Sequence, residues 1–271
     1  MIEEKKRKSS YLTILTTVTV ICIIAGCVIH LGFLPFGGRS GKMKSEKVAT
    51  DPFQNVSLEL DVGDVKIEKG SEFSVTYKYP SGCLPEISVS GGKLTVKQKM
   101  KDHISLKDLD CHLTITVPEG EELKNVDGYL DAGSVEVSGF TFDKSSNFNM
   151  ESDVGSIELI DCTFGDLKLE ADVGNISLNA CTFKKLTASG DVGDIDLREC
   201  SFDAAECTTD TGNVNVYVSG DGNFSSLTCK TDIGSITVDT DDPIRDEKMD
   251  LKVSTGDITV NGKEYEGSYK N

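Results

Sequence analysis

The sequence predicts an all-β protein: a single-stranded β-solenoid of 19–22-residue coils with an N-terminal β cap, preceded by one transmembrane helix. Three observations predict this architecture. A turn triplet of the Asp-x-Gly type returns at a nearly constant interval, and each triplet is followed by alternating apolar residues. In addition, an apolar run without Asp, Glu, Lys or Arg lies close to the N-terminus.

The chain is strongly acidic, with 45 Asp and Glu residues against 28 Lys and Arg residues and a formal net charge of −17. Nucleic acid is therefore not an expected partner, because binding to phosphate requires Lys and Arg to displace counterions. The same charge disfavours direct contact with anionic lipid or anionic wall polymer. Trp is absent and aromatic residues make up 7% of the chain, so stacking surfaces for bases or sugars are scarce.

The N-terminal region predicts a membrane anchor. Residues 1–10 form a tail with a basic cluster at 5–8, and residues 11–36 form the apolar run. A helix over this run would be about 39 Å long, enough for a tilted crossing of a hydrocarbon core of about 30 Å. Because the basic cluster precedes the run, we expect a single-pass protein of the cell membrane, with a cytosolic tail and an extracellular C-terminal domain.

The same run also fits a second interpretation. The segment from Ile24 to Cys27 resembles a lipobox, in which Cys27 would be lipidated and the preceding residues removed. The chain stays apolar from Val28 to Phe36, whereas a mature lipoprotein usually continues with a polar tether. The uncleaved anchor is therefore favoured.

The region after the anchor divides into three parts. Residues 37–50 are rich in Gly, Ser and Lys and are predicted to be a tether. Short alternating segments broken by Gly, Pro, Asp and Asn then indicate strands and turns, so residues 51–267 are expected to form one extracellular β domain. Its first part, 51–125, departs from the period and is predicted to cover the open edge of the first coil. Solenoid repeats are predicted over 126–267.

Glycines define the repeat. The intervals between them are 22, 19, 19, 19, 22 and 22 residues, and they are Gly133, Gly155, Gly174, Gly193, Gly212, Gly234 and Gly256. A period near 20 without a helical apolar stripe predicts a solenoid whose coils stack about 4.8 Å apart. Leucine-rich repeats need a longer unit and an Asn or Cys ladder that is missing here. An antiparallel meander of hairpins remains the alternative.

Cysteines fall into the same repeat. Two of the nine, Cys22 and Cys27, lie in the apolar run. Five more lie in columns that are expected to face inward, namely Cys162, Cys181, Cys200, Cys207 and Cys229. Buried cysteine behaves as a small apolar residue, so we expect reduced and protected thiols instead of disulfides.

Each corner triplet is expected to have a structural role. The Asp carboxylate is predicted to accept a hydrogen bond from the N–H of the Gly, the Gly to adopt a positive φ, and the residue between them to pack at the corner. The carboxylates would stack about 4.8 Å apart in a column of Asp153, Asp172, Asp191, Asp210 and Asp232. Calcium between the coils is the alternative, with further oxygen ligands from Ser156, Asn175, Asp194, Asn213 and Ser235. The denser glycine pattern of calcium-binding β-rolls is missing, so no metal site is assigned.

The repeated D-[VIT]-G-[SND]-[IV]-x-[LV] corners, the segment LTITVPEG and the basic-then-apolar N-terminus resemble the bacterial toast-rack, or putative-adhesin, family of β-strand-repeat proteins. The resemblance covers residues 51–267. It implies a bacterial envelope protein without an assigned molecular activity, and some members accompany membrane-stress signalling systems. The family has no active-site residues to carry over to this chain.

No residue pattern indicates catalysis. Only His103 and His112 are available as bases outside the apolar run, and these two with Cys111 have no recognised metal-ligand spacing. We therefore predict no catalytic site and no cofactor, and expect the protein not to be an enzyme.

The resulting functional hypothesis is a membrane-anchored surface module in envelope-stress sensing or scaffolding. The cytosolic tail is too short for a signalling domain, so a sensor would need a membrane-protein partner. The alternatives are an adhesin for a host or matrix ligand and a cation-binding structural spacer.

Overall fold

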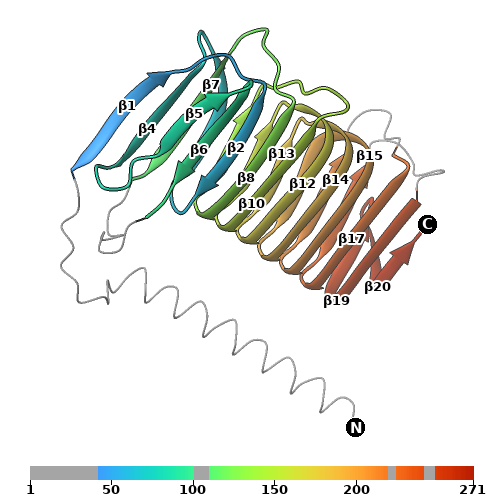
Figure 1. Cartoon of the computed structure of the whole chain (residues 1–271). Coiled ribbons are helices and arrows are strands. Elements are labelled where there is room, and N and C mark those ends of the chain that lie inside the picture. The colour runs from blue at the N-terminus through green and yellow to red at the C-terminus, as the bar shows by residue number, and fades with distance from the viewer. Residues whose placement is uncertain (1–41, 101–109, 219–223, 241–247) are drawn as a thin grey trace, which may run out of the picture. The chain divides into compact units, whose positions relative to one another are not determined.

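The computed structural model describes residues 42–100, 110–218, 224–240 and 248–271. The regular structure in these ranges consists of strands (Figure 1). The strands before the strict repeat are β1 (Met43–Ala49), β2 (Asn55–Leu60), β3 (Asp64–Gly70), β4 (Ser74–Pro80), β5 (Glu86–Ser90), β6 (Lys93–Gln98) and β7 (His112–Pro118).

The strands of the strict repeat are β8 (Asn125–Ala132), β9 (Val135–Ser138), β10 (Asn147–Val154), β11 (Ile157–Ile160), β12 (Thr163–Val173), β13 (Ile176–Asn179), β14 (Thr182–Val192), β15 (Ile195–Thr211), β16 (Val214–Val218), β17 (Ser226–Ile233), β18 (Ile236–Thr240) and β19 (Lys248–Val260). They are followed by β20 (Lys263–Lys270). None of the described ranges holds a helix long and apolar enough to cross a membrane. The predicted tail 1–10, the predicted span 11–36 and Cys27 lie outside the described residues.

The repeat forms a β-solenoid, as predicted. Strands one repeat apart pair in parallel and in register, so that Leu167 of β12 lies opposite Phe148 of β10 on one side and Leu186 of β14 on the other. Each coil contributes one strand to a long face, which contains β8, β10, β12, β14 and β17, and one to a short face, which contains β9, β11, β13, β16 and β18. The parallel register excludes the meander of antiparallel hairpins.

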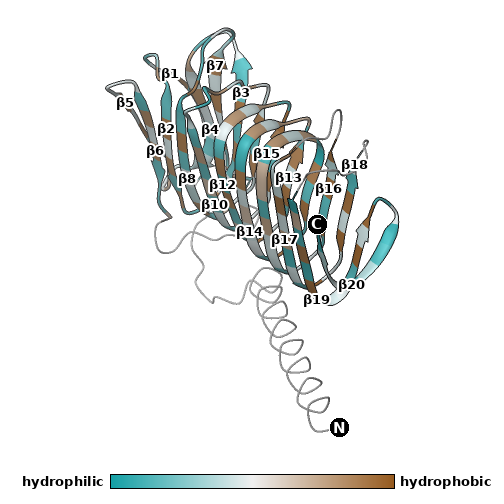
Figure 2. Cartoon of the chain, turned by 90° about the vertical axis from the view of Figure 1, so that its right-hand side faces the viewer, coloured by the Kyte–Doolittle hydropathy of each residue, from teal (hydrophilic) through white to brown (hydrophobic). Residues whose placement is uncertain are grey.

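The core lies between the two faces. Because side chains alternate between the two sides of a strand, one residue in two points inward, and the register stacks like residues on one another. The inward ladder Ile157, Ile176 and Ile195 is at most 1% exposed. Aromatic rings stack in the same way, with 5.2 Å between the ring centroids of Phe183 and Phe202. Apolar and polar bands accordingly alternate along the strands in Figure 2.

Parallel stacking begins before the strict repeat. Strand β2 pairs in parallel with β8, with Leu60 opposite Leu130, and β3 pairs in parallel with β9, with Val65 opposite Val135. On their other side β2 and β3 pair in parallel with β6 and β7. The stack of coils therefore includes strands on both sides of residue 125, and the isolated triplet at 61–63 is one of its corners.

The strands beyond these coils run antiparallel. Strand β5 pairs with β6, β4 pairs with β7, and β1 pairs with β4. Strand β1 lies inside the range 37–50, so the predicted tether is wrong for residues 43–49. This strand is polar and carried no apolar signal, and it is held by pairing with β4 and by contacts such as the 2.8 Å hydrogen bond from Tyr77 Oη to Glu46.

The other end of the stack is also antiparallel. Strand β20 follows β19 around its corner in the reverse direction, with Tyr265 opposite Ile258 and Tyr269 opposite Leu251. These register positions belong to the inward columns, and the two tyrosine rings contact edge to face with centroids 4.6 Å apart.

Candidate functional site

The glycine corner continues the ladder of backbone hydrogen bonds between coils. The N–H of Gly155 donates to the carbonyl of Val173 at 3.0 Å, and the N–H of Gly174 donates to the carbonyl of Val192 at 3.0 Å. Each glycine N–H is thus used by the neighbouring coil. The predicted hydrogen bond from this N–H to the Asp carboxylate of the same triplet is wrong, because the corner is part of the stack and not an isolated turn.

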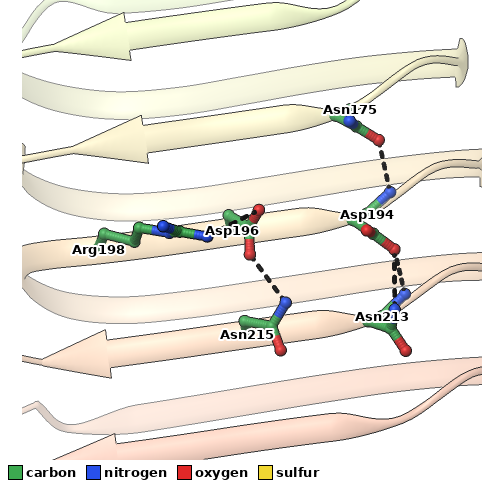
Figure 3. A network of polar contacts seen from close by, with 6 residues as sticks. All are labelled: Asn175, Asp194, Asp196, Arg198, Asn213 and Asn215. Carbon is green, nitrogen blue, oxygen red and sulfur yellow. Dashed lines mark hydrogen bonds and ion pairs between the residues drawn. The ribbon is translucent and has the colours of Figure 1, made fainter.

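The residue after each glycine links the coils through its side chain. The Asp194 N–H donates to Asn175 Oδ1 at 2.9 Å, and the Asn213 N–H donates to Asp194 Oδ1 at 2.7 Å (Figure 3). The same contact joins a continuous column of Asp64, Ser134, Ser156, Asn175, Asp194, Asn213, Ser235 and Asp257. The oxygens proposed as additional calcium ligands therefore accept backbone hydrogen bonds.

The requirement for glycine is a matter of space. A Cβ on Gly174 would lie 2.5 Å from the carbonyl carbon of Gly155 and 3.1 Å from the N of Ser156. The predicted positive φ is found at the other six repeat glycines, at 141–157°, whereas Gly174 is not among the residues with a positive φ, so the prediction is wrong at this corner alone. The residue before the glycine does not pack inward as predicted: Val154 is 51% exposed and Val173 is 48% exposed.

The aspartate column forms along the same corner, and its members crowd one another. Burial, followed by the charges of Asp191 and Asp153, raises the pKa of Asp172, and burial followed by like charge raises the pKa of Asp210. Asp153 accepts a 3.0 Å hydrogen bond from Tyr129 Oη. The remaining members of the column, Asp191 and Asp232, contribute negative charge that raises these pKa values.

Two further aspartates, Asp61 and Asp131, occupy the corresponding positions in earlier coils. Both can be recognised in the sequence, because each begins a triplet of the Asp-x-Gly type. Within the described ranges, no group of three or more His, Cys, Asp and Glu side chains is arranged to hold a metal ion. Cys111 and His112 lie in the described ranges and belong to no such group, whereas His103 lies outside the described residues.

The cysteine columns face the core, as predicted. Cys162, Cys181 and Cys200 are at most 2% exposed, and their thiols are free. Each thiol donates to backbone carbonyls of its own corner and of a neighbouring coil, as in the 3.4 Å contacts from Cys181 Sγ to Leu159 and Asn179. Burial raises the pKa of the Cys162 and Cys200 thiols to about 12, so these groups are poor nucleophiles at neutral pH. Cys207 and Cys229 are also free and buried.

The long face carries a surface trough. One hollow of about 210 Å³ is lined by residues of β2, β8, β10 and β12, and a second of about 200 Å³ by residues of β10, β12 and β14. Both are lined by Asn149 and Lys168, so they are adjacent, and together their linings come from β2, β8, β10, β12 and β14. Figure 1 shows these strands side by side in the stack. We call the two adjacent hollows together the long-face trough.

The floor and walls of the long-face trough differ in chemistry. Leu58, Gly128 and Met150 line its floor, and the terminal methyl carbon of Met150 occupies space 2.7 Å from where a Cβ of Gly128 would lie. Amides, hydroxyls and Tyr129, which is 37% exposed, line the walls. Four carboxylates and two lysines also line them, namely Asp127, Glu151, Asp166, Glu170, Lys168 and Lys185. A 2.8 Å hydrogen bond from Asn149 Nδ2 to Asp127 Oδ1 orders one wall.

The long-face trough was not predicted from the sequence. Alternation along each strand identifies outward residues, but it does not show which outward side chains leave a hollow between them. The one available signal was Gly128, an inward position without a side chain in a column otherwise filled by larger residues.

These features define a class of acidic β-solenoid proteins. The chain belongs to the Toastrack DUF4097 family, whose model matches residues 53–271. This finding confirms the family resemblance seen in the sequence. A comparison with curated proteins found no match.

Several solved structures are similar to this chain. A protein from Bacteroides fragilis NCTC 9343, described as a putative adhesin, gives a TM-score of 0.59 at 17% identity, over 81% of this chain and 96% of that one. A Parabacteroides distasonis ATCC 8503 protein with the same description gives a TM-score of 0.49 at 14% identity, over 82% and 97% of the two chains. At such identities the first likeness supports the solenoid fold alone.

Proposed function

We propose that the protein is a non-enzymatic binding module of the cell envelope, and that it acts as an adhesin through the outward side chains of its solenoid. The long-face trough is the observation that carries the proposal. It is an open, polar depression built on in-register strands, and a face of this kind holds its side chains in fixed positions relative to one another. The description of the structurally similar B. fragilis protein as a putative adhesin agrees with this role.

The proposal includes the membrane anchor. Residues 11–36 would hold the solenoid at the outer surface of the membrane, with residues 1–10 in the cytosol. A lipid at Cys27 is the alternative means of attachment. The sensing role in envelope stress has no support in the described residues or in the relatives. A cation-binding spacer likewise lacks a cluster of three or more potential metal ligands within the described residues.

Attachment of cells tests the proposed function. The full-length chain is displayed on a bacterium that does not otherwise adhere, and attachment is counted on surfaces coated with mucin, with matrix proteins and with albumin. We expect more attachment than with the empty host on at least one of the first two coatings and none on albumin. Absence of any increase, with display verified by an antibody, would remove the adhesin proposal.

Fusion of a reporter after Asn271 tests the topology. A reporter that is active only outside the cytosol should be active in this fusion. Activity confined to the cytosol would contradict the anchor and the surface role together. Palmitate labelling that is lost in Cys27→Ser would establish the lipid anchor instead.

A further inference from the structure

The long-face trough has the chemistry of a site for an elongated, uncharged and hydroxyl-rich ligand. We propose that it binds a neutral oligosaccharide, with the sugar chain lying across the strands and one sugar ring packed against Tyr129. This inference rests on the proposed function, since it names the ligand of an adhesive surface.

The shape of the trough favours a chain over a compact ligand. The depression crosses β2, β8, β10, β12 and β14, and neighbouring strands are about 4.8 Å apart, so its length is roughly 19 Å. Its two hollows are adjacent, because Asn149 and Lys168 line both. A ligand of several linked rings fits this length, whereas a single small molecule would fill one hollow.

The polar groups of the walls favour hydroxyls. Each sugar hydroxyl both donates and accepts a hydrogen bond, and the walls offer both kinds of partner. Glu151 and Glu170 are acceptors, Lys168 is a donor, and Asn149 provides one group of each kind. Two of these side chains already hold defined positions, because Lys168 Nζ lies 3.3 Å from Glu170 Oε2 and Asn149 donates to Asp127.

Tyr129 supplies the apolar surface that a sugar ring needs. Its hydroxyl donates to Asp153 at 3.0 Å, and this hydrogen bond raises the pKa of the phenol and fixes the end of the side chain. The ring is 37% exposed and lies beside the trough. An aromatic ring held by its polar end presents a fixed apolar area at a low entropic cost.

Other ligand classes fit less well. The four carboxylates against two lysines repel anionic sugars and nucleic acid. An extended peptide cannot add to the sheet at this place, because the strands beneath the trough pair with neighbours on both sides and their edges are used. The trough is open and its walls are charged, which does not suit a lipid chain.

Binding of labelled oligosaccharides tests the inference. The full-length chain in mild detergent is titrated with fluorescent cellotetraose, maltotetraose, mannotetraose and chitotetraose, followed by anisotropy, with a heparin fragment and an unrelated peptide of similar length as further probes. We expect at least one neutral tetrasaccharide to bind and the heparin fragment and the peptide not to bind.

Two trough variants and one matched control place the site. Tyr129→Ala should weaken binding about tenfold or more, and Glu151→Gln by several-fold, as expected for an aromatic contact and its polar neighbour. Tyr217→Ala is the control, because Tyr217 is similarly exposed at 38% and lies on β16 of the short face. Its binding should equal that of the wild type, and melting curves should show that all three variants are folded.

The outcomes separate the inference from the proposed function. If the four neutral sugars do not bind, or if Tyr129→Ala binds as well as the wild type, the oligosaccharide site is wrong. Binding of the peptide or of the heparin fragment in the trough would also overturn it. Cells that display Tyr129→Ala and attach like the wild type would retain the adhesin role and lose this site, whereas a wild type that never attaches would lose the role itself.

Discussion

Three consecutive coils have one corner with glycine and one with cysteine, and the two corners solve the same geometrical problem in different ways. At the glycine corner the backbones approach so closely that a Cβ on Gly174 would meet the peptide group of Gly155. At the cysteine corner the chain bends through a residue with positive φ that is not glycine, as in Ala180 and Glu199 at 51° and 53°. The following cysteine is then buried and directs its thiol to carbonyls.

The difference explains why one corner is a clear sequence signal and the other is a weaker one. Steric exclusion of a side chain admits glycine alone, so the glycine corner is invariant along the repeat. Positive φ costs an ordinary residue about 1–2 kcal/mol but does not forbid it, so the position before the cysteine varies among Asp161, Ala180 and Glu199. The buried cysteine is then the constant element of that corner.

The largest expected effect is that of Gly174→Ala. The added Cβ cannot be accommodated without separating two coils, so we expect a loss of about 3 kcal/mol or more in the free energy of unfolding, at the upper end of the cost of overpacking. Urea unfolding of the full-length chain would measure it. The control is Gly139→Ala, where nothing lies within 4 Å of the added Cβ and only the positive φ of 72° opposes it; about 1 kcal/mol is expected. Equal costs would contradict the steric explanation.

The second prediction concerns the thiols of the cysteine corner. Cys162, Cys181 and Cys200 should react with iodoacetamide only when the protein unfolds, because they are buried and burial keeps them protonated. Mass spectrometry after alkylation under native and denaturing conditions would measure the labelling. Disulfides among these three, or rapid native labelling, would show that the column does not face the core in solution.

The ladder beside the glycine corner should have an intermediate effect. Asn175→Ala removes the oxygen that accepts the Asp194 N–H, and the expected loss is about 1 kcal/mol. Asn175→Ser should recover most of it, since serine makes the same contact from Ser156 to the N–H of Asn175. Thermal melts of both variants would compare them, and an equal loss would show that the side-chain ladder adds no stability.

Relief of the strained position at the cysteine corner should stabilise the protein. Ala180→Gly removes the cost of positive φ and adds freedom to the unfolded chain, and a net gain of roughly 0.5 kcal/mol is expected. The same change at an inward position without positive φ, Ala188→Gly, should destabilise, because it only adds freedom and removes packing. A loss in both variants would mean that the bend at Ala180 carries no strain.

The smallest effect is expected in the aspartate column. The raised pKa of Asp172 means that the folded protein holds this proton more tightly than the unfolded chain does. The resulting stability is complete below the unfolded carboxyl pKa of about 4 and is lost as pH rises through the raised value. Asp172→Asn should therefore raise the melting temperature slightly at pH 7 and leave it nearly unchanged at pH 3.

Calcium provides the critical comparison for this column. Melting temperatures of the wild type with a chelator and with millimolar calcium should nearly coincide. A large rise with calcium that Asp172→Asn abolishes would make the corner a metal site and would restore the cation-binding role.

The sequence by itself determined the solenoid, its period and the inward columns. These features follow from the alternation of side chains along a strand and from the register that equal coil lengths impose, and both are local properties of the chain. Ile157, Ile176 and Ile195 follow their glycines at the same spacing, and the structure places them in one buried ladder. The family could be recognised for the same reason, since its motif is a repeated turn.

Only the tertiary structure decided how the corner uses its groups and where the surface is hollow. Asp172 was expected to cap its own turn, but the Gly174 N–H is taken by the neighbouring coil, and a contact between coils is not visible in the spacing of one triplet. Strand β1 was missed because pairing with β4 and not its own composition holds it. The long-face trough likewise depends on five strands brought together by stacking and on Met150 filling the space left by Gly128.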